Sequence, residues 1–74
     1  MDNRTIRGWK FEWSEKHSMF ECRGSVYYDD EHDEAPDPKL WSAAMELEAD
    51  LVSEGHSAEA NHSEKGWVEV MIEK

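Results

Sequence analysis

Carboxylate side chains are the groups in this sequence that are numerous enough, and spaced closely enough, to act together chemically. Residues 29–37 (DDEHDEAPD) hold six carboxylates in nine positions. A second set, Glu46, Asp50 and Glu54, has a spacing of four residues, which aligns its members along one ridge of a helix about 6 Å apart. Grouped carboxylates can coordinate a metal ion, assist a nucleophile or attract a basic macromolecule.

A metal site is not predicted. An EF-hand counted from Asp29 needs glycine at the sixth position and glutamate at the twelfth, where this sequence has Glu34 and Leu40. None of the four histidines has the close or paired spacing of zinc ligands. The carboxylates of residues 29–37 are therefore not expected to form a defined cation site.

Catalysis is not predicted either. Cys22, the single cysteine, falls in an expected strand with its side chain toward the core, where it is a small hydrophobe rather than a nucleophile. The four glycines are isolated, so no phosphate-binding loop is present, and so small a domain offers little concave surface. We expect a protein that is not an enzyme and needs no cofactor.

The distribution of charge favours attraction to a basic partner. Residues 1–28 have five basic and four acidic groups, whereas residues 29–74 have three basic and fourteen acidic groups, a net charge of −11. The segment RTIRGWKFEW mixes basic and aromatic side chains as nucleic-acid binders do, but the charge of the remaining chain repels phosphate. We therefore expect no direct contact with nucleic acid or membrane, and attraction to a basic protein surface.

The chain is expected to form one small acidic domain, residues 1–74. A chain of this length buries only about 60% of its unfolded surface, so the core is thin. Cys22 has no partner for a disulfide, no apolar run approaches the ~20 residues of a membrane span, and the first residues lack the apolar segment of a signal peptide. These features predict a cytoplasmic location.

One helix is predicted, at about residues 38–54. Asp37 suits the N-cap, Pro38 the first helical position, and Gly55 the left-handed position that follows a helix. At about 100° per residue, one face of this helix is apolar and so is a flank beside it. The face consists of Leu40, Ala43, Ala44, Leu47 and Leu51, and the flank of Trp41, Met45 and Val52.

Three strands are predicted around the helix. Residues 6–13, 18–28 and 67–73 alternate apolar and polar side chains, with Gly8 marking a bulge in the first, whereas the polar residues 56–65 predict a loop. The fold class is α+β with the element order ββαβ: a three-stranded antiparallel sheet, strand order 3-1-2, with one helix packed on one face. The expected core comprises Trp9, Phe11, Trp13, Leu40, Ala44, Leu47, Leu51, Val68, Val70 and Ile72.

The strand order follows from the direction of the chain. A helix returns the chain along the sheet, so the third strand runs parallel to the second and can pair antiparallel with the first. Pairing beside the second strand through a parallel crossover is the alternative.

The sheet face away from the helix would stay uncovered. It would show Met19, Tyr27, Trp67 and Met71 among charged side chains that include Glu12, Glu21 and Glu69. A tryptophan and two methionines on an open face indicate a contact surface, for example in a homodimer. These four residues are the alternative interface.

The carboxylates are the candidate partner-binding residues. Glu46, Asp50 and Glu54 repel one another at this spacing, and the helix dipole disfavours an anion at Glu54. Helix stability does not explain the ridge, so binding to a basic partner is the functional interpretation and a solvated polar face the alternative. The predicted set is Asp29, Asp30, Glu31, Asp33, Glu34, Glu46, Asp50 and Glu54.

With these features the chain resembles small acidic phage-encoded inhibitors of host defence, such as anti-CRISPR and anti-restriction proteins, some of which mimic DNA. The resemblance is one of class, and it rests on size, charge, element order, residues 29–37 and the ridge. It implies a non-enzymatic protein that blocks a basic surface of a nucleic-acid-binding complex. A structural or assembly protein, dimeric through the open sheet face, and an acidic antitoxin are the alternatives.

Overall fold

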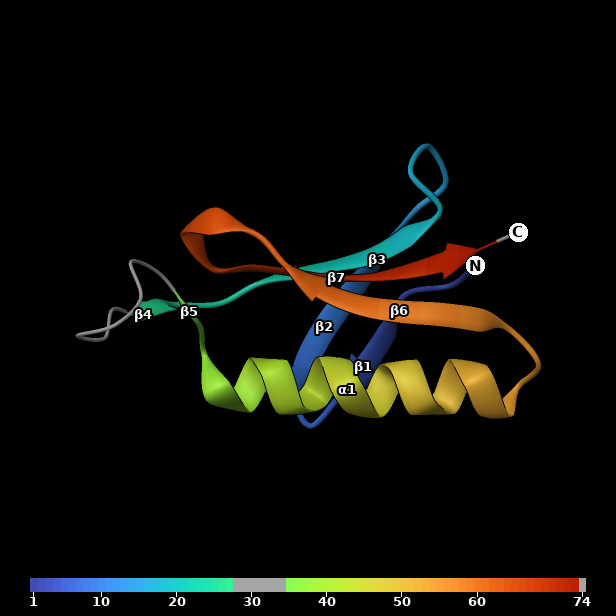
Figure 1. Cartoon of the computed structure of the whole chain (residues 1–74), viewed down its shortest axis with the longest axis horizontal. Coiled ribbons are helices and arrows are strands. Elements are labelled where there is room, and N and C mark those ends of the chain that lie inside the picture. Colours follow the sequence, from blue (N-terminus) through green and yellow to red (C-terminus); the bar gives the residue numbers. More distant parts are fainter. Residues whose placement is uncertain (28–34, 74) are drawn as a thin grey trace.

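The computed structural model describes residues 1–27 and 35–73, which form an α-helix on one face of an antiparallel sheet (Figure 1). The elements are β1 (Arg4–Ile6), β2 (Trp9–Ser14), β3 (Met19–Arg23), β4 (Val26–Tyr27), β5 (Ala35–Pro36), α1 (Pro38–Ser53), β6 (Ser57–His62), the 3-10 helix η1 (Glu64–Gly66) and β7 (Trp67–Glu73). The main sheet has five strands in the order β1-β2-β3-β7-β6, and β4 pairs with β5 separately. The α+β class is confirmed, whereas the prediction of three strands is wrong.

α1 begins and ends close to where the sequence predicts. The Asp37 carboxylate accepts a hydrogen bond from the backbone N–H of Lys39 at 2.8 Å, and Pro38 occupies the first turn. Gly55, at φ +97°, takes the left-handed conformation after the helix. The predicted apolar face is entirely buried: Leu40, Ala43, Ala44, Leu47 and Leu51.

The core lies between α1 and the inner face of the sheet. Cross-strand partners Trp13 and Phe20 pack with their ring centroids 4.9 Å apart. Three of the predicted core residues lie at the rim of this core and are only partly buried: Trp9, Trp13 and Ile72. The buried residues contributed by the sheet are Phe11, Phe20, Cys22, Val68 and Val70.

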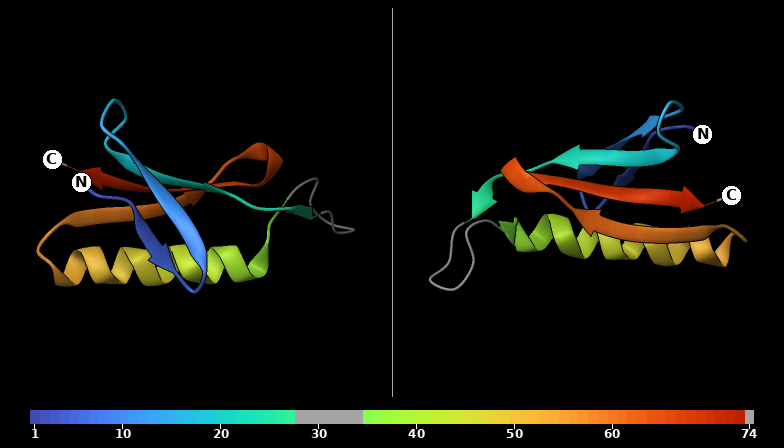
Figure 2. Two further views of the ribbon diagram at one scale, coloured as in Figure 1. Left: turned by 180° about the vertical axis from the view of Figure 1, so that it is seen from behind. Right: turned by 45° about the horizontal axis from the view of Figure 1, so that its top comes forward.

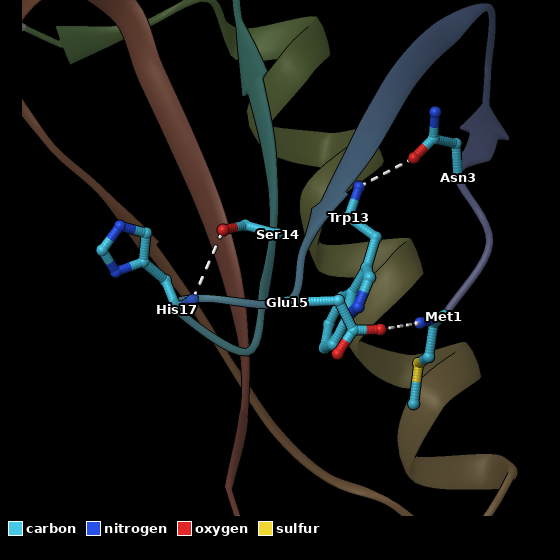
Figure 3. A network of polar contacts seen from close by, with 6 residues as sticks. All are labelled: Met1, Asn3, Trp13, Ser14, Glu15 and His17. Atoms are coloured by element: carbon cyan, nitrogen blue, oxygen red, sulfur yellow. Dashed lines mark hydrogen bonds and ion pairs between the residues drawn. The ribbon is translucent and has the colours of Figure 1, made fainter.

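The N-terminal segment is fastened to the hairpin of β2 and β3 (Figure 3). The side-chain oxygen of Asn3 accepts a hydrogen bond from the backbone N–H of Trp13 at 2.9 Å. The ammonium group of Met1 pairs with the Glu15 carboxylate at 3.2 Å. These contacts attach the residues before β1 to the end of β2 and to the turn that follows it.

The prediction of a loop over residues 56–65 is wrong, because residues 57–62 form β6. β6 pairs antiparallel with β7, and Ala60 lies opposite Val70. The alternation of a half-buried strand is present, since Ala58 and Ala60 pack against the core. Alanine is a weak strand former, however, and contributes little to a hydrophobic pattern.

The missed strand also explains why the predicted order 3-1-2 is wrong. α1 does return the chain so that the next strand runs parallel to β3, but that strand is β6. β7 then reverses again and is antiparallel to β3, with which it pairs: Phe20 lies opposite Val70, and Cys22 opposite Val68. Figure 2 shows β7 between β3 and β6.

The first two predicted strands are each divided. Arg7 and Gly8 both have positive φ, 53° and 84°, and form a two-residue turn that brings Ile6 opposite Trp9. Gly8 therefore marks a hairpin between β1 and β2 rather than a bulge. The second predicted strand ends in the main sheet at Arg23, and the chain continues into the separate strand β4.

Two glycines allow the chain after β3 to touch the chain before β7. The Gly24 N–H donates a hydrogen bond to the Gly66 carbonyl at 2.9 Å. Gly66 has φ +82°, and a Cβ there would lie 2.5 Å from the carbonyl oxygen of Gly24. This contact fixes how β7 enters the sheet.

Candidate functional site

The acidic ridge of α1 faces the arginines of the first hairpin. Both terminal nitrogens of the Arg4 guanidinium donate to the Glu54 carboxylate, at 2.6 Å each. The Arg7 Nε donates to Glu46 at 3.0 Å. Two of the three ridge carboxylates, Glu46 and Glu54, therefore attach β1 and its turn to α1, a tertiary role that the sequence did not indicate.

Arg4 also covers one end of the core. Its guanidinium lies over the ring of Phe20, 5.8 Å from the centroid. The hydrogen bonds between Arg4 and Glu54 lower the pKa of the Glu54 carboxyl and raise the pKa of Arg4. A planar, two-pronged pair of this kind cannot be reproduced by lysine. Arg4 thus attaches β1 to the C-terminal end of α1.

We expect the Arg4–Glu54 pair to make stability depend on pH. The pKa of Glu54 lies below the ordinary value of 4.5, so the pair stabilises the fold fully above that pH and its contribution is lost as the pH falls through the lowered pKa. Glu54→Gln should therefore lower the Tm at neutral pH and approach the parent in acid. Thermal melts of the parent and of Glu54→Gln, from neutral pH into acid, measure the difference in Tm between the two proteins. A difference in Tm that does not change with pH would contradict this role of the pair. Glu59→Gln, at an exposed position on β6, is the control.

Of the acidic segment 29–37, only residues 35–37 belong to the described structure. Asp37 caps α1, as described above. The remaining predicted binding residues of this segment lie outside the described residues: Asp29, Asp30, Glu31, Asp33 and Glu34.

The opposite flank of α1 faces β6. The Glu48 carboxylate accepts a hydrogen bond from the backbone N–H of Ala60 at 2.6 Å, and Trp41 meets His62 edge to face with ring centroids 5.3 Å apart. Sequence reasoning missed Glu48 because its partner strand was predicted to be a loop. Carboxylates of α1 thus attach both outer strands of the sheet, β1 and β6, to the helix.

The sheet face away from α1 holds three members of the alternative interface. Met19 and Met71 lie directly opposite each other on β3 and β7, and Trp67 lies opposite Arg23. Trp67 and Met71 are each 38% exposed. The Arg23 guanidinium lies over Trp67, 5.9 Å from the ring centroid. The side chain of Tyr27, the fourth predicted member, lies outside the described part of the structure.

A row of three carboxylates crosses the same face. Glu12 on β2 is opposite Glu21 on β3, which is opposite Glu69 on β7. Neighbouring strands are ~4.8 Å apart, and like charges directly opposite each other destabilise a sheet. Within residues 1–27 and 35–73 none of the three forms an ion pair. The sequence placed these residues on the open face but could not align them, because alignment depends on strand order.

Three features of the described residues bear on metal binding and catalysis. They contain no group of three or more His, Cys, Asp or Glu placed to hold a metal ion. Burial raises the pKa of the Cys22 thiol, which opposes formation of a nucleophilic thiolate. A solvent-open hollow of about 430 Å³ beside the start of α1 has no nucleophile paired with a base; its lining is Arg7, Trp9, Pro38, Lys39 and Ser42.

No helix within residues 1–27 and 35–73 is long and apolar enough to cross a membrane. No family model matches the chain, and no curated protein or solved structure is significantly similar to it. Its function must therefore be inferred from its own surfaces.

Proposed function

We propose that this protein binds a basic surface of another protein and blocks it, and that the open sheet face makes the contact. The observation that carries the proposal is the row of Glu12, Glu21 and Glu69 beside Met19 and Met71. Mutual repulsion within the row lowers the stability of the sheet, and arginine or lysine side chains of a partner would offset that repulsion. The methionines supply adaptable apolar area next to the charges.

The sheet face suits this role better than the ridge on α1. Glu46 and Glu54 already have arginine partners in the same chain, which an incoming basic group would have to displace. The partner class we propose is a protein whose basic surface otherwise contacts nucleic acid. The support for this class is the net charge of −10 and the resemblance to small acidic inhibitors of host defence.

The carboxylate row also argues against a homodimer through this face. A two-fold interface presents the same patch to itself. Two open faces would then bring Glu12, Glu21 and Glu69 of one copy near those of the other. A basic partner has no such cost.

Two variants with the same loss of charge test the proposal. E12Q/E21Q/E69Q neutralises the row, and E46Q/D50N/E54Q neutralises the ridge. We expect the row variant to bind the partner more weakly and to melt at a higher temperature. Each relieved pair is worth roughly 0.2–1 kcal/mol, and about 1 kcal/mol shifts the Tm of so small a domain by about 4–8 °C. The ridge variant should keep its affinity and melt at a lower temperature, because it loses the pairs with Arg4 and Arg7.

The measurement has two stages. Capture from a cell lysate on the immobilised parent, at low and high salt, identifies the partner; titration of the purified partner then gives Kd for the parent and both variants. Binding should weaken with salt, and added nucleic acid should compete. A row variant that binds as tightly as the parent at both salt concentrations would rule out the sheet face. Loss of binding in the ridge variant alone would place the contact on α1.

A further inference from the structure

The side of the molecule formed by β6 and the neighbouring flank of α1 has apolar groups that the separate chain does not bury. Met45 and Val52 are 45% and 54% exposed. They share a helix flank with Trp41, which contacts His62 of β6. Exposed apolar side chains therefore lie beside the edge of the sheet.

The outer edge of β6 presents backbone groups to this same side. The Ala60 N–H points away from β7, because it donates to Glu48. Alternate residues of an antiparallel strand share this direction, so the N–H groups of Ala58 and His62 also point outward. β6 contains no proline, lysine or arginine, the residues that commonly protect an edge. The Glu48 carboxylate instead occupies one of these outward N–H groups, that of Ala60.

We propose that a second copy of this chain docks on this edge, with the two β6 strands pairing antiparallel about a two-fold axis at Ala60. Ala60 then pairs with Ala60 of the second copy, and Ala58 with His62 of the second copy, through the outward backbone groups. Glu59 lies opposite Asn61 of the second copy, so the two glutamates avoid each other. The register centred on Glu59 would place like charges face to face.

The helix flank adds apolar area to the extended sheet. An axis perpendicular to the sheet keeps both α1 helices on the same face. The two flanks then approach each other across the paired strands, and Met45 and Val52 of each copy lose exposed surface. The interface therefore combines backbone hydrogen bonds with apolar contact.

Glu48 governs the strength of this association. Its carboxylate has to release the Ala60 N–H before two β6 strands can pair. Glu48→Ala removes the competing hydrogen bond and one negative charge, and should tighten self-association roughly tenfold. In the separate chain, Glu48 thus competes with a second β6 strand for the Ala60 N–H.

Sedimentation equilibrium over a range of protein concentrations tests the proposal. The mass of the parent should rise toward that of a dimer, and more so at high salt, because each copy has a net charge of −10 and salt screens the repulsion. Binding of a basic partner should instead weaken as salt rises. The opposite salt dependences let the failure of self-association be distinguished from the failure of partner binding.

Substitutions on two faces locate the interface. Met45→Glu and Val52→Glu put charge on the helix flank at exposed positions, and both should leave the protein folded and return it to a monomer. Met71→Glu, the same kind of change on the open sheet face, is the matched control and should leave self-association unchanged. The proposal fails if Glu48→Ala stays monomeric at high salt, or if Met71→Glu is the variant that abolishes the dimer.

Discussion

Leu47→Ala should unfold a large part of the population, with a loss of about 2–5 kcal/mol in the free energy of unfolding. Leu47 is fully buried at the centre of the apolar face of α1. Truncation removes its contacts with the sheet and leaves a cavity that a close-packed core cannot fill. A domain of this size has little stability to spare, so the loss is a large fraction of the total.

Urea denaturation followed by circular dichroism measures the effect, with Val52→Ala as the control. Val52 lies on the same helix but is 54% exposed, so its truncation should change stability by less than about 0.5 kcal/mol. Equal unfolding midpoints for Leu47→Ala and the parent would show that α1 does not cover the core through this face.

Gly66→Ala should destabilise the fold by about 2 kcal/mol or more. Alanine at φ +82° costs roughly 1–2 kcal/mol from local sterics alone. The added Cβ would also lie 2.5 Å from the Gly24 carbonyl oxygen, which belongs to the backbone and cannot rotate away. The two strands joined at this contact, β3 and β7, are both central to the sheet.

Gly8→Ala separates these two contributions. Gly8 has φ +84°, but a Cβ there would meet nothing within 4 Å. Thermal melts of both variants should therefore show a clearly larger loss for Gly66→Ala, and the difference measures the backbone contact. Similar losses for the two variants would mean that the chain shifts to accommodate the new methyl group.

The helix could be predicted from the sequence because its signals are local. Asp37, Pro38 and Gly55 act on their immediate neighbours, and the apolar spacing between them is regular. The sheet depends on less local information. β6 was missed because its inward side chains are alanines, and this one omission reversed the expected direction of β7 and with it the strand order.

The candidate sites depend even more on distant pairing. The ridge on α1 was recognised, but the ion pairs of Glu46 and Glu54 were not, because their partners Arg7 and Arg4 lie in another part of the sequence. Conversely, Glu12, Glu21 and Glu69 are unremarkable in their own strands. They become a row only when the register of three strands is known.

The central position of β7 has a consequence for how the protein is made. β7 lies between β3 and β6 and contributes two fully buried valines, Val68 and Val70. Among the elements of residues 1–27 and 35–73, β7 comes last in the sequence and so leaves the ribosome after the others. Until β7 follows, the nascent chain has no partner for the inner edge of either β3 or β6, and α1 has no complete surface to cover. The main sheet can therefore be completed only after β7 is made, through contacts between distant residues, which slows folding and leaves apolar surface uncovered until then.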